Sequence, residues 1–349
     1  MAKRKLSDAE QSLEDFAADE IADASTDELR RIIHRLEKQL ASAKGRTEDL
    51  VAAALQGARD AYLSVPRTVI PAPKERAGKG KPEAALWHLT DWQGGKRTSS
   101  YDTETMRERV RVFWEKARTI TEIQRAHHPV KLGVILFGGD MLEGLFNFPR
   151  QVFEIDSSLF AQWANVSQLV IETVNAALSI YSEVLVVAEW GNHGRIGAKR
   201  DAVPTHDNVD RMIYEHARQM MKGTARLKWD DCPEDIQHVE VGNYRALLIH
   251  GDEIGRNGFA SAQTIVKHVN DWRSGAHEWE FRDCYVGHYH THREDSLADG
   301  EGAVFWTGST ESSNRYAGVN LARRGRPLQR LHFVDLEKGR VSAQYRVYL

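Results

Sequence analysis

Acidic, amide and imidazole side chains recur in this sequence directly after short apolar runs. The residues concerned are Asp91, Asp140, Asn192, His193, His250, His288 and His290. Such runs are typical of buried strands, and side chains that follow parallel strands meet at one edge of a sheet. Carboxylate, amide and imidazole donors together suit Mn²⁺, Fe²⁺ or Zn²⁺, whereas Ca²⁺ prefers oxygen donors alone. The pattern predicts a divalent-metal site, in which one carboxylate can bridge two ions about 3.5–4 Å apart.

Each piece taken singly has a plainer interpretation. A His-x-His pair is more often a surface or core feature than a metal site, and Gly-Asp after a strand is usually a turn. Gly191-Asn192-His193 can likewise be a tight turn, because Asn tolerates the left-handed backbone region. The succession of all the pieces, each directly after a strand, favours the metal site.

In this order the motifs resemble the signature of calcineurin-like metallophosphoesterases: Asp-x-His, Gly-Asp, Gly-Asn-His, His-Gly and Gly-His-x-His. The chain carries them as Thr90-Asp91-Trp92-Gln93, Gly139-Asp140, Gly191-Asn192-His193, His250-Gly251 and Gly287-His288-Tyr289-His290. The resemblance covers residues 83–349. The form Gly-Asn-His-Gly-Arg at 191–195 and the segment Thr307-Gly308-Ser309-Thr310 are similar to phage and prophage members related to DNA-repair exonucleases.

The resemblance implies a role for each matching residue. The implied metal ligands are Asp91, Gln93, Asp140, Asn192, His250, His288 and His290. Asp140 would bridge two ions, Asp91 and His290 would bind the first, and Asn192, His250 and His288 the second. His193 would bind no metal and would instead stabilise the transition state or protonate the leaving oxygen. The implied reaction is phosphodiester hydrolysis by a hydroxide that the two ions activate, with catalysis by positioning and charge neutralisation.

One position departs from the family pattern, because Gln93 stands where the family usually has histidine. Its carbonyl oxygen can bind a metal, but it is a weaker donor than imidazole toward Zn²⁺ or Fe²⁺. We therefore expect the first metal position to be the weaker one. The expected cofactors are two divalent ions, with Mn²⁺ preferred and Mg²⁺, Fe²⁺ or Zn²⁺ as alternatives.

Charged residues beside the motifs are candidates for supporting roles. Arg195, Lys199 and Arg200 follow the Gly-Asn-His turn and can hold substrate phosphates, although a solvated loop accounts for them equally well. Glu143 and Asp252 lie next to expected ligands, where we expect them to accept hydrogen bonds from imidazole N–H groups.

The elements that must position these residues alternate between strands and helices. Strands are expected at 84–89, 132–137, 184–188, 225–229, 237–241, 245–250 and 283–287, helices at 103–127, 159–181, 209–221 and 259–272, and a hairpin at 328–348. Alternation that gives way to strands predicts an α/β fold, a layered β-sandwich flanked by helices and preceded by an N-terminal helical segment.

The N-terminal region differs from the rest. Residues 1–24 are polar and acidic and are expected to be a disordered leader. Residues 25–64 carry Leu29, Ile33, Leu36 and Leu40 on one helical face, which predicts a helical hairpin or coiled coil. We expect homo-oligomers through this face; docking of a nucleic acid or partner protein is the alternative. Residues 65–82, rich in proline, indicate a linker, and 83–349 the catalytic domain.

Composition excludes several classes of protein. The 349 residues carry 47 Lys and Arg against 50 Asp and Glu, which argues against a strongly basic duplex-binding domain. Two cysteines without a CxxC pair argue against a disulfide framework or a thiolate zinc site and suit a reducing cytoplasm. No apolar run is long enough to span a bilayer, and the N-terminus lacks the apolar stretch of a secretory signal. We expect a cytoplasmic protein without a membrane partner.

The favoured function is metal-dependent hydrolysis of a phosphodiester, with DNA as the substrate of a nuclease. Two alternatives stay open. One is a phosphodiesterase for small nucleotides or a phosphomonoesterase, and the other is a non-catalytic scaffold with a degenerate metal site.

Overall fold

The computed structural model describes residues 31, 34, 35, 38, 70–74, 78–145, 147, 151–197, 207–230, 236–254, 260–311 and 326–349 of the chain. The chain divides into two units, Met1–Arg67 and Thr68–Leu349. The described residues of the smaller unit are helical and exposed: Arg31, His34, Arg35 and Lys38. The expected leader at 1–24 and the other positions of the expected helical segment lie outside the described residues.

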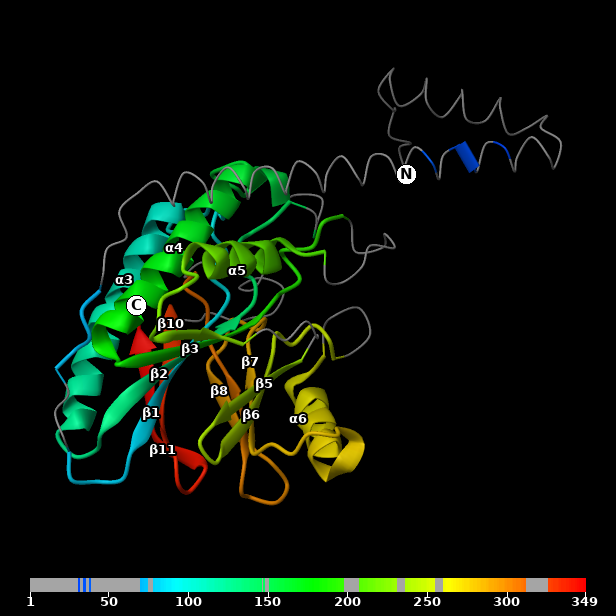
Figure 1. Ribbon diagram of the computed structural model, residues 1–349. Helices are drawn as coiled ribbons and strands as arrows, with labels where there is room; N and C mark the ends of the chain where they lie inside the picture. The colour runs from blue at the N-terminus through cyan, green and yellow to red at the C-terminus, as the bar shows by residue number, and fades with distance from the viewer. Residues whose placement is uncertain are drawn as a thin grey trace. The chain divides into compact units, whose positions relative to one another are not determined.

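A six-stranded sheet forms one layer of the larger unit, in the order β11-β10-β1-β2-β3-β4 (Figure 1). Its strands are β1 (Glu83–Leu89), β2 (Val130–Gly138), β3 (Glu183–Glu189), β4 (Leu227–Trp229), β10 (Leu328–Asp335) and β11 (Arg340–Tyr348). Strands β1 to β4 run parallel, whereas β10 and β11 are antiparallel. β1 is buried along its whole length, as expected for a parallel strand covered on both faces.

A five-stranded sheet forms a second layer, in the order β5-β6-β7-β9-β8. Its strands are β5 (Gln237–Val241), β6 (Tyr244–Ile249), β7 (Asp283–Val286), β8 (Arg293–Ser296) and β9 (Ala303–Trp306). The central strands β6, β7 and β9 are parallel, and the edge strands pair antiparallel. Apolar side chains of both sheets share one core, among them Leu86, Val134, Val187, Val239, Leu248 and Phe305. The two sheets therefore pack face to face.

Helices cover the outer faces of the two sheets. The long helices are α3 (Thr103–Arg125), α4 (Leu159–Ile180), α5 (Val209–Met220) and α6 (Ala262–Asp271), with short turns η1 (Gln151–Phe153) and η3 (Trp272–Ala276). α3 and α4 contact β2 of the first sheet (Figure 1). The side chains of Ile265 and Val269 attach α6 to the second sheet. α3 begins where the Asp102 side chain accepts a hydrogen bond from the amide of Thr105 at 2.8 Å, which caps the helix.

This arrangement of helix, sheet, sheet and helix confirms the predicted layered α/β fold. β8 and β9 were not predicted. β8 has the sequence Arg-Glu-Asp-Ser, with no apolar alternation, and it forms because it pairs with β9. Within the expected linker, the amide of Gly80 donates to the carbonyl of His127 at 2.8 Å, so this part of the segment packs on the larger unit. Among the described helices, none combines the length and apolar character needed to cross a membrane.

Candidate metal centre

The motifs meet because the strands that precede them end at the same edge of the two sheets. Asp91 follows β1, Asp140 follows β2 and Asn192 follows β3 in the first sheet. His250 follows β6, and His288 and His290 follow β7 in the second sheet. The two sheets are joined here, since the amide of His288 donates to both carboxylate oxygens of Asp91 at 3.0 and 3.1 Å.

Unusual backbone geometry is concentrated at these positions. Among the described residues, the non-glycine residues with positive φ are Asp91 (53°), Gln93 (47°), Asp140 (53°), His288 (61°) and His290 (50°). Every one of them is a predicted metal ligand. A left-handed conformation costs such residues of order 1–3 kcal/mol and persists where the surrounding structure enforces it, commonly at functional sites. The turns therefore keep a costly geometry that aims these side chains inward.

Asp140, His250 and His288 form one part of the site, with one potential ligand atom from each within 4.8 Å of the others. His250 Nε2 lies 3.1 Å from Asp140 Oδ2. His250 Nδ1 lies 2.7 Å from the carbonyl of Gly138, which can only accept, so Nδ1 carries the proton and donates it. Nε2 is thereby left to face Asp140. We call Asn192, His250 and His288, which the resemblance assigns to the second ion, the second group.

Asp91, Gln93 and His290 form the first group. His290 Nε2 lies 3.2 Å from Asp91 Oδ1 and 3.0 Å from Gln93 Nε2. Asp91 is held in turn by the hydroxyl of Thr90, which donates to Oδ2 at 2.8 Å. The structure thus brings Gln93 together with His290 and Asp91.

Several donor atoms in the two groups fit a metal. Gln93 Oε1, Asn192 Oδ1 and His250 Nε2 are buried and make no hydrogen bond, although His250 Nε2 lies 3.1 Å from the Asp140 carboxylate. Buried polar atoms are rarely left without a partner, because the loss of hydration costs about 1–3 kcal/mol each. All three are atoms that coordinate divalent ions. The donor set therefore fits such a cofactor.

The charges in the site point the same way. Burial would raise the pKa of Asp140, but His250 and His193 hold it below its usual range. Burial and the neighbouring His250 lower the pKa of His288 to about 3, which keeps this imidazole neutral. Burial lowers the pKa of His290, but the Asp91 carboxylate outweighs it and raises the value. An ionised Asp140 and a neutral His288 are the forms in which these two side chains bind a divalent ion.

His193 is oriented by groups outside the two metal groups. Its Nδ1 donates to the carbonyl of Glu143 at 2.7 Å, and Gln151 Nε2 lies 3.3 Å from the same atom. Its backbone amide donates to Asp140 Oδ1 at 2.7 Å. Nε2 lies 3.9 Å from Asp140 Oδ2 and so faces the centre. Glu143 thus accepts the imidazole N–H through its backbone carbonyl and not through its carboxylate.

Sequence reasoning missed two buried charges that link the site. Lys96 Nζ lies 3.5 Å from Glu143 Oε2 and 3.9 Å from Glu311 Oε2. Glu143 Oε2 is 3.5 Å from Nδ1 of His193, and Glu311 Oε2 is 3.7 Å from Nδ1 of His290. Lys96 therefore sits between carboxylates that face both imidazoles. In the sequence, the only indication that Lys96 and Glu311 belong to the site is that they lie close to Gln93 and to the Thr307–Thr310 segment.

Other supporting residues are placed differently from expectation. Arg195 donates through its guanidinium to the carboxylate of Asp252, so the two pair with each other. The Asp252 carboxylate therefore accepts a hydrogen bond from Arg195, whereas we expected it to accept one from an imidazole N–H. Lys199 and Arg200 lie outside the described residues.

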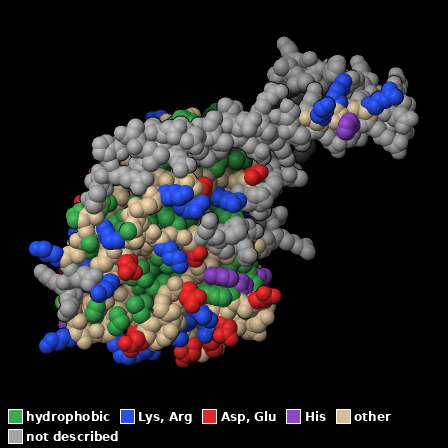
Figure 2. All heavy atoms as spheres, viewed as in Figure 1, with side chains coloured by type: hydrophobic (Ala, Val, Ile, Leu, Met, Phe, Trp, Pro, Cys, Tyr) green, Lys and Arg blue, Asp and Glu red, His purple; other side chains and the backbone are tan. Residues whose placement is uncertain are grey.

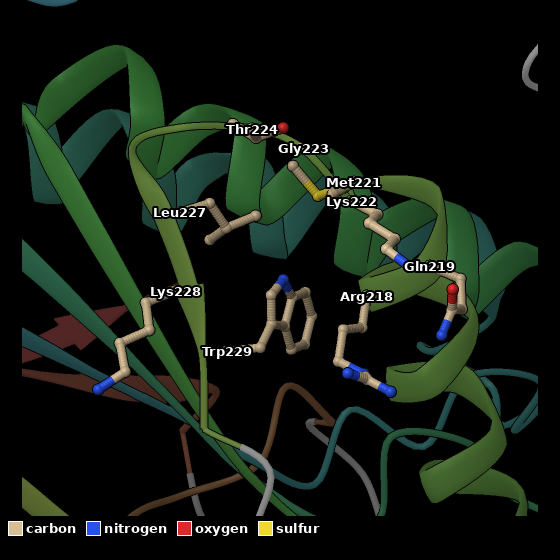
Figure 3. A pocket seen from close by; sticks show the side chains of 9 residues that line it. All are labelled: Arg218, Gln219, Met221, Lys222, Gly223, Thr224, Leu227, Lys228 and Trp229. Carbon is tan, nitrogen blue, oxygen red and sulfur yellow. The ribbon is translucent and has the colours of Figure 1, made fainter.

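A cavity of about 310 Å³ lies elsewhere, between α5 and β4 (Figure 3). It is lined by Arg218, Gln219, Met221, Lys222, Gly223, Thr224, Leu227, Lys228 and Trp229. None of these is a predicted site residue, and Arg218 is already paired with Glu215 at 2.7 Å. We therefore place the chemistry at the strand ends and not in this cavity.

Comparison with known proteins adds little to this geometry. A scan against protein-family profiles and a search of curated proteins both find no match. Among solved structures, the chain is similar to Vps29 complexed with zinc from Entamoeba histolytica at 12% identity, covering 75% of this chain and 99% of that one, with a TM-score of 0.36. A predicted phosphoesterase from Streptococcus pneumoniae matches at 10% identity, 72% and 84% coverage and a TM-score of 0.30. The phosphopantetheinyl hydrolase from Mycobacterium tuberculosis matches at 12% identity, 66% and 91% coverage and 0.29. Scores this low carry no argument about function.

Proposed function

We propose that this protein is a divalent-metal-dependent phosphoesterase that cleaves phosphodiester bonds. The observation that carries the proposal is the set of three buried donor atoms without partners, on Gln93, Asn192 and His250. Gln93 has a left-handed backbone, as do the neighbouring candidate ligands Asp91, Asp140, His288 and His290. Backbone strain and buried donors without hydrogen bonds occur together at this place, and bound cations would account for both.

The residues of the chain divide the work. Asp140 and the two groups would hold two cations, which when bound lower the pKa of water and neutralise charge on the phosphoryl oxygens. His193 is held by Glu143 through Nδ1, so its Nε2 can carry a proton to the leaving oxygen. The amide of His193 donates to Asp140 at the same time, which fixes the position of the acid relative to the Asp140 carboxylate.

We propose single-stranded DNA as the substrate class. Val152 and Phe153 are 49% and 84% exposed and directly follow Gln151, which contacts His193. An exposed aromatic ring next to a phosphoester site can stack on a base, which supports single-strand binding. Lys and Arg side chains on the face in Figure 2 are interspersed with Asp and Glu among the described residues, an arrangement that offers no basic track for a duplex. The resemblance to DNA-repair exonucleases supports the same choice.

The test compares substrates and variants. Purified protein would be assayed with Mn²⁺, Mg²⁺ and Zn²⁺ on single-stranded DNA, bis-p-nitrophenyl phosphate and p-nitrophenyl phosphate. Asp140→Asn should abolish turnover and lower bound metal. His193→Ala should keep its metal while the rate falls by roughly 10²–10⁴-fold, the range for a positioned acid. Asp271→Asn, at an exposed carboxylate paired with Lys267, is the matched control and should behave as wild type.

The outcomes separate the candidates. Cleavage of the monoester alone would replace the proposal with a phosphomonoesterase, and cleavage of the small diester but not DNA with a small-nucleotide phosphodiesterase. A wild-type protein that binds no divalent metal and cleaves none of the three would be a scaffold, and the proposal would be wrong.

A further inference from the structure

The first turn of α5 packs on the turn that carries Asn192. Asn208 caps the helix, since its side-chain oxygen accepts the amide of Asp210 at 2.8 Å. Its Nδ2 donates to the carbonyl of Gly191 at 2.7 Å. The amide of Val209 donates to the carbonyl of Gly194 at 2.7 Å. The Gly191–Gly194 turn is therefore bonded at both of its ends to α5.

The carboxylate of Asp210 bridges two turns. It is fully buried. Its Oδ1 accepts the amide of Met141 at 3.1 Å, and its Oδ2 accepts the amide of Gly191 at 3.0 Å. Met141 directly follows Asp140, and Gly191 directly precedes Asn192. One side chain thus binds the backbone beside a ligand from β2 and beside a ligand from β3.

The turn at Gly191 packs directly against the turn at Asp140. A Cβ atom on Gly191 would lie 2.1 Å from Oδ1 of Asp140 and 2.3 Å from its amide nitrogen. The spacing of the two turns is thus set by direct contact on one side and by the Asp210 carboxylate on the other.

A purely local role does not account for Asp210. A carboxylate in the first turn of a helix usually serves the helix dipole or its free amides. Here Asn208 provides the cap, and both oxygens of Asp210 bond to other loops. Burial and the charge of Asp140 raise the pKa of Asp210 to about 7, so the ionised group is costly to keep at this place. A carboxylate offers a separate acceptor oxygen to each of the two amides.

We propose that Asp210 is a positioning residue that sets the spacing of Asp140 and Asn192 and thereby the affinity of the site for divalent metal. This inference rests on the proposed function, since it concerns the same centre. Loss of a group that orients metal ligands without itself binding the metal typically lowers metal affinity or activity by roughly 10–100-fold.

Asp210→Asn is the direct test, because the amide keeps one acceptor and places an NH₂ group against the other backbone amide. Calorimetric titration with Mn²⁺ should show a dissociation constant raised by roughly 10–100-fold, together with a fall in kcat/KM. Asp283→Asn is the matched control. Asp283 is an equally buried carboxylate that accepts the amide of Ala303 and the hydroxyl of Tyr244, each at 2.8 Å, and it should bind Mn²⁺ as wild type does.

A second variant covers a failure of the first to fold, judged by urea unfolding. Asn208→Asp keeps a capping oxygen for α5 but removes the Nδ2 donor to Gly191, and should weaken Mn²⁺ binding in the same direction. If the wild type binds Mn²⁺ and cleaves phosphodiesters but a folded variant keeps the wild-type Mn²⁺ affinity, the positioning role of Asp210 is wrong and the proposed function stands. A wild type that neither binds Mn²⁺ nor cleaves them would overturn the proposed function and this inference with it.

Discussion

Lys96 offers a sharp test of how the site is built, through the substitution Lys96→Met. The side chains of Lys96, Glu143 and Glu311 are at most 4% exposed, and Nζ lies 3.5 and 3.9 Å from the two carboxylates. Burial lowers the pKa of Lys96, but Glu143 and Glu311 outweigh it and raise the pKa above its ordinary value. The buried group is therefore an ammonium ion, and methionine replaces it with an uncharged side chain of similar length.

The magnitude follows from what the substitution leaves behind. Two buried carboxylates would lose their cation, and neither oxygen of Glu311 has a hydrogen bond to fall back on. Removal of one partner from a buried ion pair costs about 3–5 kcal/mol. Such a loss is a large share of the 5–15 kcal/mol that stabilises a typical domain. Glu311→Gln in the same chain removes one of the stranded charges and should recover about 1–3 kcal/mol.

Urea unfolding of the metal-free protein in chelator at pH 7 measures these values. Lys267→Met is the control, because its exposed pair with Asp271 should contribute less than about 1 kcal/mol. A Lys96→Met variant within about 1 kcal/mol of wild type, or a double variant less stable than the single one, would refute the account of Lys96 as a buried counter-ion.

Three further predictions use other parts of the chain. Gln93→His should tighten Zn²⁺ or Mn²⁺ binding at the first group and narrow the difference between two unequal sites in a metal titration; two equally tight sites in wild type would contradict this. Asp283 has its pKa raised by burial from 3.8 to about 6, so the folded state binds the proton more tightly and stability falls as pH rises from about 4 to 6, by at most about 3 kcal/mol. Asp283→Asn should flatten that part of a stability–pH curve, and an unchanged slope would count against it. Removal of Met1–Arg67 should leave Thr68–Leu349 folded and active with a smaller particle mass in light scattering, whereas an insoluble product would show that the helices complete the fold.

The sequence predicted most of the site because its signal is local. Each ligand follows an apolar run, and a run of that kind forms a buried strand whatever it pairs with. Asp91, Asp140 and His250 were therefore placed by the rule that parallel strands end at one edge of a sheet. The pairing order of the strands and the short strands β8 and β9 were not predicted; β8 needed tertiary information, because Arg293–Ser296 carries no apolar pattern and gains its hydrogen bonds from β9.

The residues that support the ligands could not be predicted in the same way. Lys96 and Glu311 are far apart in the chain and meet only in the folded protein. Asp210 lies in the first turn of a helix, where a carboxylate has an ordinary reason to occur. Its two bonds to Met141 and Gly191 depend on how α5 meets the first sheet. Such contacts leave no periodic or spacing signal in a single sequence.

The expected metal ligands and the expected substrate-binding residue Arg195 differ in whether their polar atoms already have hydrogen-bond partners. Gln93, Asn192 and His250 each keep a buried donor atom without a hydrogen bond, which a bound cation would complete. Arg195 is the opposite case, because Asp252 already occupies its guanidinium, and a substrate phosphate would have to compete with that carboxylate. The cost of breaking this pair reduces what Arg195 can contribute to phosphate binding. Affinity for the substrate should therefore come chiefly from the metal centre itself, and the ligand positions are the part of the site on which the proposed function depends.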